Sequence, residues 1–144
     1  MKGTNDIKNS DTSYEGTRER PLSSIADGIT RANLLYPGEV AQVCVTNGEY
    51  IESNIQLVNK ISVLGGFSTE DWNAERNPTS NVTIITDNRT TGGTTGDPIR
   101  VIDCPLSVTD STNTVVDGFT MNLGGGAQNA GVFIQGSMTL SNNI

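Results

Sequence analysis

The stretch AQVCVTNGEYIESNIQLVNKISVLGGF, residues 41–67, decides the fold. Its two ends, residues 41–45 and 61–67, are short apolar runs bounded by turn-forming residues, which indicates two buried strands. Between them, residues 50–53 and 54–58 have the pattern of two further short strands. Three short strands within about 20 residues match the length of one coil of a parallel solenoid.

Comparable segments recur along the rest of the chain. They cover residues 82–86, 99–103, 114–121 and 131–136, with starts about 15 to 21 residues apart, and a final segment, residues 138–144, follows. Most connections are too long for two-residue hairpin turns, and only residues 46–50 have that form. We therefore predict an all-β parallel solenoid of about five to six short coils rather than a β-sandwich. The polar stretches 68–81 and 87–97 are expected to loop out of it.

A capping helix is predicted before the first strand, over about residues 21–34. One face of this segment is apolar, formed by Leu22, Ile25, Ile29 and Ala32. Pro21 suits a first helical turn, and Pro37-Gly38 stops the helix. The helix should cover the open N-terminal end of the coils. Residues 1–18 are polar and aperiodic and are expected to form a flexible leader, so the domain runs over residues 19–144.

Composition argues against several classes of function. The net charge of −7 disfavours a nucleic-acid partner, and no apolar run approaches the roughly 20 residues of a membrane-spanning helix. The chain has no histidine, and Cys44 and Cys104 form no CxxC pair, which argues against zinc sites and histidine-dependent catalysis. We expect two free thiols, because three coils of about 4.8 Å each would separate these cysteines by roughly 14 Å.

Several motifs resemble those of a known family. The stretch from residue 43 to residue 78 resembles the opening coils of bacterial secreted right-handed β-helix proteins with the pectin-lyase-like fold. The matching residues are Gly48, Tyr50, Glu52, Gly65, Gly66, Phe67, Trp72 and Arg76. The resemblance implies a right-handed β-helix, secretion or display at the cell surface, and a longer parent protein of which this chain is an N-terminal fragment. It does not specify an activity, because members of the family include enzymes and adhesin-like proteins.

Four charged residues are the catalytic candidates. The resemblance implies clustered aspartates in hydrolases, for which Asp103, Asp110 and Asp117 are available, and a basic residue in lyases, for which Arg100 is available. No second catalytic feature accompanies any of them, so we favour structural roles. The oxygen ligands that Ca²⁺ prefers are offered by Asp87, Asp97 and Asp103, but no spacing motif joins these residues. We therefore expect no catalytic residue, metal or cofactor.

Aromatic and charged residues near the first coil are the weak candidates for ligand contacts. Tyr50, Trp72 and Arg76 combine ring faces with a cation, which suits a glycan. The competing interpretation, which we favour, is structural. In it Tyr50 packs under the cap helix or a loop, Glu52 caps backbone N–H groups at a coil corner, and Trp72 with Arg76 pins its own loop to the coils.

The predicted function is that of a non-catalytic solenoid domain with a structural, adhesive or assembly role. The alternative is the N-terminal part of a polysaccharide-active lyase or hydrolase. No helix is predicted to cover the C-terminal end, so we expect self-association there, as a two-fold dimer. The apolar contributors expected at that end are Val132, Phe133, Ile134, Met138 and Leu140.

Overall fold

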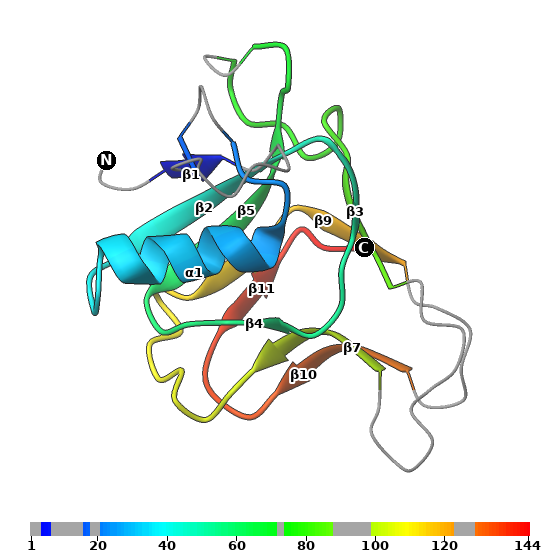
Figure 1. Cartoon of the computed structure of the whole chain (residues 1–144). Coiled ribbons are helices and arrows are strands. Elements are labelled where there is room, and N and C mark those ends of the chain that lie inside the picture. The colour runs from blue at the N-terminus through cyan, green and yellow to red at the C-terminus, as the bar shows by residue number, and fades with distance from the viewer. Residues whose placement is uncertain (1–3, 7–15, 18–20, 72–73, 88–98, 123–128) are drawn as a thin grey trace.

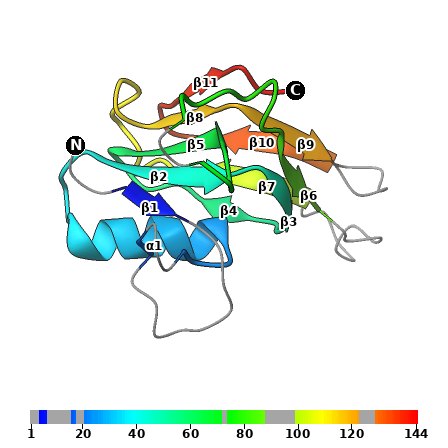
Figure 2. The ribbon, with the colours of Figure 1, turned by 90° about the horizontal axis from the view of Figure 1, so that it is seen from above.

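The chain winds repeatedly through three parallel β-sheets in the computed structural model, which describes residues 4–6, 16–17, 21–71, 74–87, 99–122 and 129–144. Figure 1 looks along the stack of coils, with the sheets arranged around a central core. Figure 2 shows the same stack from above, with equivalent strands lying one beyond the other. This arrangement is an all-β parallel solenoid, as the spacing of the segments predicted.

In the part of the chain that the structure describes, three coils are complete and a fourth begins. The first contains β2 (Ala41–Thr46), β3 (Gly48–Ile51) and β4 (Ile55–Gln56). The second contains β5 (Ile61–Phe67), β6 (Thr83–Thr86) and β7 (Ile99–Cys104), and the third β8 (Val115–Asp117), β9 (Phe119–Asn122) and β10 (Asn129–Ile134). The fourth opens with β11 (Thr139–Ser141). The prediction of about five to six coils is wrong, because residues 99–103 and 131–136 are the third strands of existing coils and start no new ones.

Equivalent residues of successive coils stack on one another. In the sheet with the order β1-β2-β5-β8-β11, Val43 pairs with Val63, which pairs with Val116. These three valines are at most 2% exposed, so they form one wall of the core. The β-branched residues that indicated strands are therefore the ones that face inward, as expected for a half-buried pleated surface.

Helix α1 (Ile25–Leu35) covers the N-terminal end of the stack. It lies across the first coil at the end opposite β11, as Figure 2 shows, and buries Ile25, Ile29 and Ala32. The predicted helix is confirmed, but its first turn begins at Ile25 and not near residue 21. Ser24 is the N-cap, because its Oγ accepts a hydrogen bond from the Asp27 N–H at 2.9 Å.

A short strand extends the first sheet beyond the first coil. β1 (Thr4–Asp6) pairs in parallel with β2 and lies next to α1. The sequence did not predict it, because residues 1–18 show no strand periodicity. A strand of three residues with one neighbouring strand is stabilised mainly by its pairing with that neighbour, and its own sequence contributes little to its stability.

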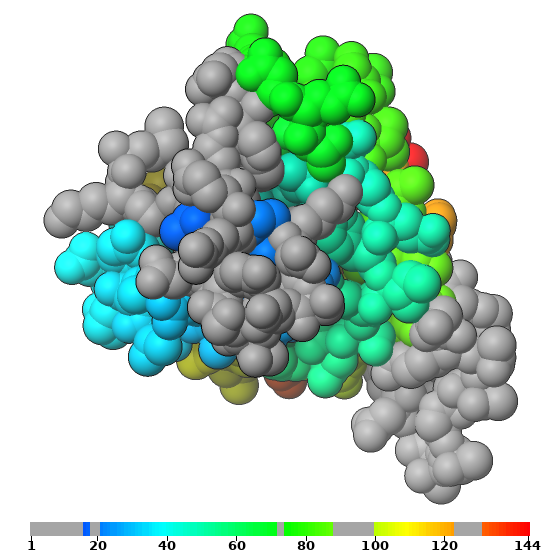
Figure 3. All heavy atoms as spheres, turned by 45° about the horizontal axis from the view of Figure 1, so that its top comes forward, coloured from blue at the N-terminus to red at the C-terminus, as the bar shows by residue number. Residues whose placement is uncertain are grey.

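The predicted excursion over residues 68–81 joins β5 to β6 and rises from the body of the molecule, in bright green at the top of Figure 3. The second predicted loop, residues 87–97, lies outside the described residues from position 88 onward.

Within the described part of the chain, no helix is long and apolar enough to cross a membrane.

Candidate functional site

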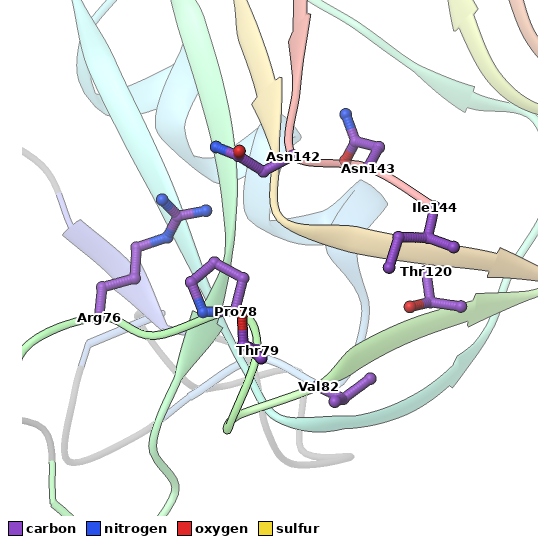
Figure 4. A pocket seen from close by; sticks show the side chains of 8 residues that line it. All are labelled: Arg76, Pro78, Thr79, Val82, Thr120, Asn142, Asn143 and Ile144. Atoms are coloured by element: carbon purple, nitrogen blue, oxygen red, sulfur yellow. The ribbon is translucent and has the colours of Figure 1, made fainter.

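A pocket of about 520 Å³ opens beside the β3-β6-β9 sheet. The β5–β6 excursion forms one wall and the residues after β11 form the other, as Figure 4 shows. Between them lie Val82, which precedes β6, and Thr120 on β9. The complete lining consists of Arg76, Pro78, Thr79, Val82, Thr120, Asn142, Asn143 and Ile144.

Arg76 fastens the excursion to the coil corner beneath it. Its Nη1 donates to Asp117 Oδ2 at 2.6 Å, and its Nη2 donates to the Asp117 carbonyl oxygen at 2.9 Å. Its Nε donates to the carbonyl oxygen of Gly65 in the second coil. One side chain therefore connects the corners of the second and third coils, and we call Arg76 and Asp117 the corner clamp.

The corner glycines make this close approach possible. Gly118 has a φ of +81°, in the left-handed region, and an added Cβ there would collide with the Arg76 guanidinium and with Pro78. Gly66 has a φ of +91°, and its added Cβ would collide with the Pro78 backbone. Of the glycines quoted in the family resemblance, Gly66 is thus required by the packing of Pro78, whereas an added Cβ at Gly65 would collide with the Gly118 carbonyl oxygen of the next coil.

The electrostatics of the clamp favour an ionised carboxylate. Burial tends to raise the pKa of Asp117, but hydrogen bonds from Arg76, Asn142 and Ser141, together with the Arg76 charge, outweigh it. The pKa of Asp117 is therefore held below its usual value. Asn142 takes part because its Nδ2 donates to Asp117 Oδ1 at 2.7 Å. Asp117 is thus an ion-pair partner with both oxygens occupied, which does not suit a proton donor in acid–base catalysis.

The pocket offers both hydrogen-bonding groups and apolar surface. Hydroxyl groups come from Thr79 and Thr120, and apolar surface comes from Pro78, Val82 and Ile144. Among the described lining residues there is no Asp or Glu side chain. The pocket can bind a small polar molecule, but its walls supply no acid–base pair.

The structure separates the ligand candidates from one another. Arg76 lines the pocket, whereas Trp72 lies outside the described residues. Tyr50 is 5% exposed and faces the core, where its hydroxyl lies 2.9 Å from Thr46 Oγ1. Burial raises the pKa of the Tyr50 hydroxyl, the Thr46 hydrogen bond opposes the rise, and the Glu52 charge adds to it. Tyr50 is therefore placed as a core residue, with its hydroxyl bonded inside the coil.

Glu52 caps the helix that covers the coils. Its Oε1 accepts from the Ile25 N–H at 2.7 Å, and its Oε2 accepts from the Ala26 N–H at 3.1 Å. These donors are at the helix N-terminus, which lacks intrahelical partners and favours negative charge. Burial nevertheless raises the pKa of Glu52, since these two bonds lower it by less and Asp27 raises it further. Glu52 therefore caps backbone N–H groups, but those of the N-terminus of α1 and not those of a coil corner as predicted.

The catalytic candidates do not come together. Asp103 lies on β7, where its Oδ2 accepts from Gln56 Nε2 at 2.9 Å and lies 3.5 Å from Arg100 Nη1. Asp110 accepts from the Asn113 side chain and from the backbone N–H groups of residues 112 and 113, so it builds a turn. These bonds, with the Asn113 side chain first, hold the pKa of Asp110 below its usual value. Asp117 belongs to the clamp, on a different sheet from Asp103.

The calcium hypothesis gains no support from the geometry. Asp97 lies outside the described residues, and Asp87 and Asp103 are both buried. Among the residues that the structure describes, no group of three or more His, Cys, Asp or Glu side chains is placed to hold a metal ion.

Of the eight lining residues, only Arg76 was a candidate from the sequence, and the polar residues that were missed are Thr79, Thr120, Asn142 and Asn143. Thr79 belongs to a predicted loop and the other three to predicted strand segments, and in neither kind of segment does the sequence distinguish a pocket wall. One signal was present, because Asn142 stands where the third coil has Gly118, directly after the paired residues Ser141 and Asp117, so it marks the corresponding corner of the fourth coil. Asn142 has a φ of +50°, as a corner residue needs.

Comparisons with known proteins find no match. No family model, no curated protein and no solved structure resembles the chain closely enough to assign it. The parallel sheets are compatible with a β-helix of the pectin-lyase-like type, but this identity is carried only by the motifs quoted from the sequence.

Proposed function

We propose that this chain is a non-catalytic right-handed β-helix module of the pectin-lyase-like type, with a structural, adhesive or assembly role. The observation that supports it most directly is the use of its charged residues. Arg76 and Asp117 join two coil corners, Glu52 caps α1, and Asp110 builds a turn. Side chains that could have carried acid–base chemistry are engaged in holding the coils together.

General rules of topology support the right-handed form. Successive strands within each sheet are parallel, and they are joined by long crossover connections. Parallel crossovers are right-handed in about 98% of known cases, because the twist of the strands favours that hand. Secretion or surface display rests on the family resemblance alone.

A polysaccharide screen tests the non-catalytic role. The chain is incubated with a panel of neutral and acidic polysaccharides, and reducing ends and the absorbance of unsaturated products are measured. We expect no turnover above a heat-denatured control. Turnover that is lost in Asp103→Asn or Asp117→Asn, with the variants still folded, would overturn the proposal in favour of a polysaccharide-active enzyme.

Glycan binding without turnover is the second candidate, favoured by the pocket. Its threonine hydroxyls can bond sugar hydroxyls while Pro78 and Val82 pack against a sugar face. Calorimetric titration with short oligosaccharides tests it. Thr120→Arg should fill the pocket and abolish binding, whereas Ser107→Arg, at an exposed turn elsewhere, should leave it unchanged. Equal binding by both variants would exclude this pocket as the site.

A further inference from the structure

The pocket beside the β3-β6-β9 sheet has one charged residue in its lining, and that charge is already paired. Among the described lining residues, Arg76 is the only Lys, Arg, Asp or Glu. Its Nη1 lies 2.6 Å from Asp117 Oδ2, and the Asp117 side chain is 12% exposed. Opposite charges at this distance cancel most of the field that each would produce in the pocket. The pocket wall is therefore close to neutral, although it contains an arginine.

The hydrogen-bonding groups that remain for a ligand are mostly uncharged. Both polar ends of Asn143 are used within the chain, since its Oδ1 accepts from the Phe119 N–H at 3.0 Å and its Nδ2 donates to the Val116 carbonyl oxygen at 2.9 Å. By contrast, the hydroxyls of Thr79 and Thr120 have no hydrogen-bond partner in the part of the chain that the structure describes. A hydroxyl can both donate and accept. These two side chains can therefore bond the hydroxyls of a ligand that has no charge.

A carboxylate lies on the same outer face of this sheet. Glu49 pairs in register with Ile84, and Ile84 pairs with Thr120, so the three residues form one row across the sheet. Glu49 is exposed, and its Oε1 accepts from the Thr86 hydroxyl at 2.6 Å. The chain as a whole has a net charge of −7. These charges would repel an anionic ligand at the pocket, and the described lining holds no unpaired cation to offset the repulsion.

From these contacts we infer that the pocket binds uncharged sugars and excludes acidic ones, because Asp117 neutralises the Arg76 charge. The inference rests on the glycan-binding candidate proposed above and names its ligand class. The two threonine hydroxyls bond sugar hydroxyls, while the apolar side chains of Pro78 and Val82 pack against the C–H face of the ring. A uronic acid would have to desolvate its carboxylate against these groups with no free cation to receive it, which is unfavourable.

Calorimetric titration of the 144-residue chain with matched trisaccharides tests the inference. The neutral probes are the trisaccharides of galactose, glucose and mannose, and the acidic probes are the corresponding trisaccharides of galacturonate, glucuronate and mannuronate. We expect at least one neutral probe to bind, and its uronate counterpart to bind at least about tenfold more weakly, in about 10 mM and in about 1 M salt. Salt screens the repulsion from the net charge but leaves the pairing of Arg76 with Asp117 in place, so the selectivity should persist.

Removing the carboxylate should change the ligand class. Asp117→Asn leaves the Arg76 charge unpaired, so this variant should bind the uronate at least about tenfold more tightly than the parent does. Glu39→Gln is the matched control, because it removes one negative charge at an exposed position after α1 and should leave the exclusion unchanged. Circular dichroism checks that each variant is folded. If Asp117→Asn does not fold, the series on the parent chain decides alone.

Three outcomes would overturn the inference but leave the glycan-binding candidate standing. These are a uronate that binds the parent as tightly as its neutral counterpart, a uronate that does so once salt is added, and a folded Asp117→Asn variant that still excludes it. Binding of none of the probes by the parent would overturn the glycan-binding candidate and this inference together. The polysaccharide screen tests the non-catalytic role separately, because it measures products and not binding.

Discussion

Arg76 Nη1 lies 2.6 Å from Asp117 Oδ2, although 41 residues separate them in the sequence. The contact joins the β5–β6 excursion to the corner that follows β8. Both side chains are mostly buried, at 23% and 12% exposure. Since Arg76 also donates to the Asp117 and Gly65 carbonyl oxygens, the corner clamp holds two coils and one pocket wall in register.

Removing the guanidinium should destabilise the whole solenoid. We expect Arg76→Ala to lower the free energy of unfolding by about 2 kcal/mol, because it leaves the mostly buried Asp117 carboxylate without its charged donor. Arg76→Lys should recover little of this loss, since the single nitrogen of an ammonium group cannot reach the three separate acceptors that the guanidinium bonds. Urea unfolding followed by circular dichroism measures both. Glu75→Ala, at the exposed neighbouring position, is the control and should unfold like the parent.

The clamp should also govern stability in acid. The folded-state pKa of Asp117 lies below its usual value. Its contribution to the free energy of unfolding is therefore present above about pH 4 and is lost as the pH falls through the lowered pKa. The Asp117→Asn variant should have a lower free energy of unfolding than the parent already at neutral pH, because one side-chain amide cannot accept hydrogen bonds from both Arg76 and Asn142. Urea midpoints between about pH 6 and pH 2 should fall less steeply for this variant than for the parent. Parallel slopes would contradict the assignment.

The sequence predicted those parts of the fold that depend on local pattern. Short apolar runs marked the strands because their alternate residues, such as Val43 and Val63, stack in the core. The assignment of strands to coils failed at residues 99–103, because a short apolar run looks the same on any of the three sheets. The clamp and the Glu52 cap join residues that are far apart in sequence. Such pairs depend on which coils lie side by side, and one sequence does not specify that.

Glu52 should contribute to stability through the helix end. We expect Glu52→Ala to cost about 1 kcal/mol, the usual effect of losing a helix cap, because the Ile25 and Ala26 N–H groups lose their acceptor. Glu39→Ala, at an exposed position after the helix, should have little effect. The two variants are compared by urea unfolding at neutral pH, and equal midpoints would show that the cap is energetically unimportant.

The pH dependence of Glu52 should have the opposite sign to that of Asp117. Its folded-state pKa is raised, mainly by burial, so the folded protein binds the proton more tightly than the unfolded chain does. Its contribution therefore grows as the pH falls from above the raised pKa to about 4.3, the value in the unfolded chain. Glu52→Gln should remove this gain. The comparison uses the urea series proposed for Asp117.

The two cysteines should be unreactive in the folded protein. Both are buried and neither forms a disulfide, with Cys44 on β2 of the first coil and Cys104 at the end of β7 in the second. The predicted separation of three coils is wrong, because β7 belongs to the second coil. Burial raises the pKa of Cys104, the Gly136 N–H opposes the rise, and the Asp103 charge adds to it, so little thiolate is present near neutral pH. A thiol reagent should label both residues only in urea, and rapid labelling of the native protein would contradict this placement.

The cap helix should be essential for folding, and a matched pair of substitutions on this helix tests that expectation. Ile25 is 1% exposed against the first coil, whereas Leu34, on the same helix, is 68% exposed. Ile25→Asp places a carboxylate against the core and should cost about 4 kcal/mol or more, because the charge would be buried and the nearby Glu52 is itself acidic. Leu34→Asp adds the same charge in solvent and should change the unfolding midpoint little. If both variants melt within a degree or two of the parent, α1 is not the cap of the solenoid, and the N-terminal coil must be stable without it.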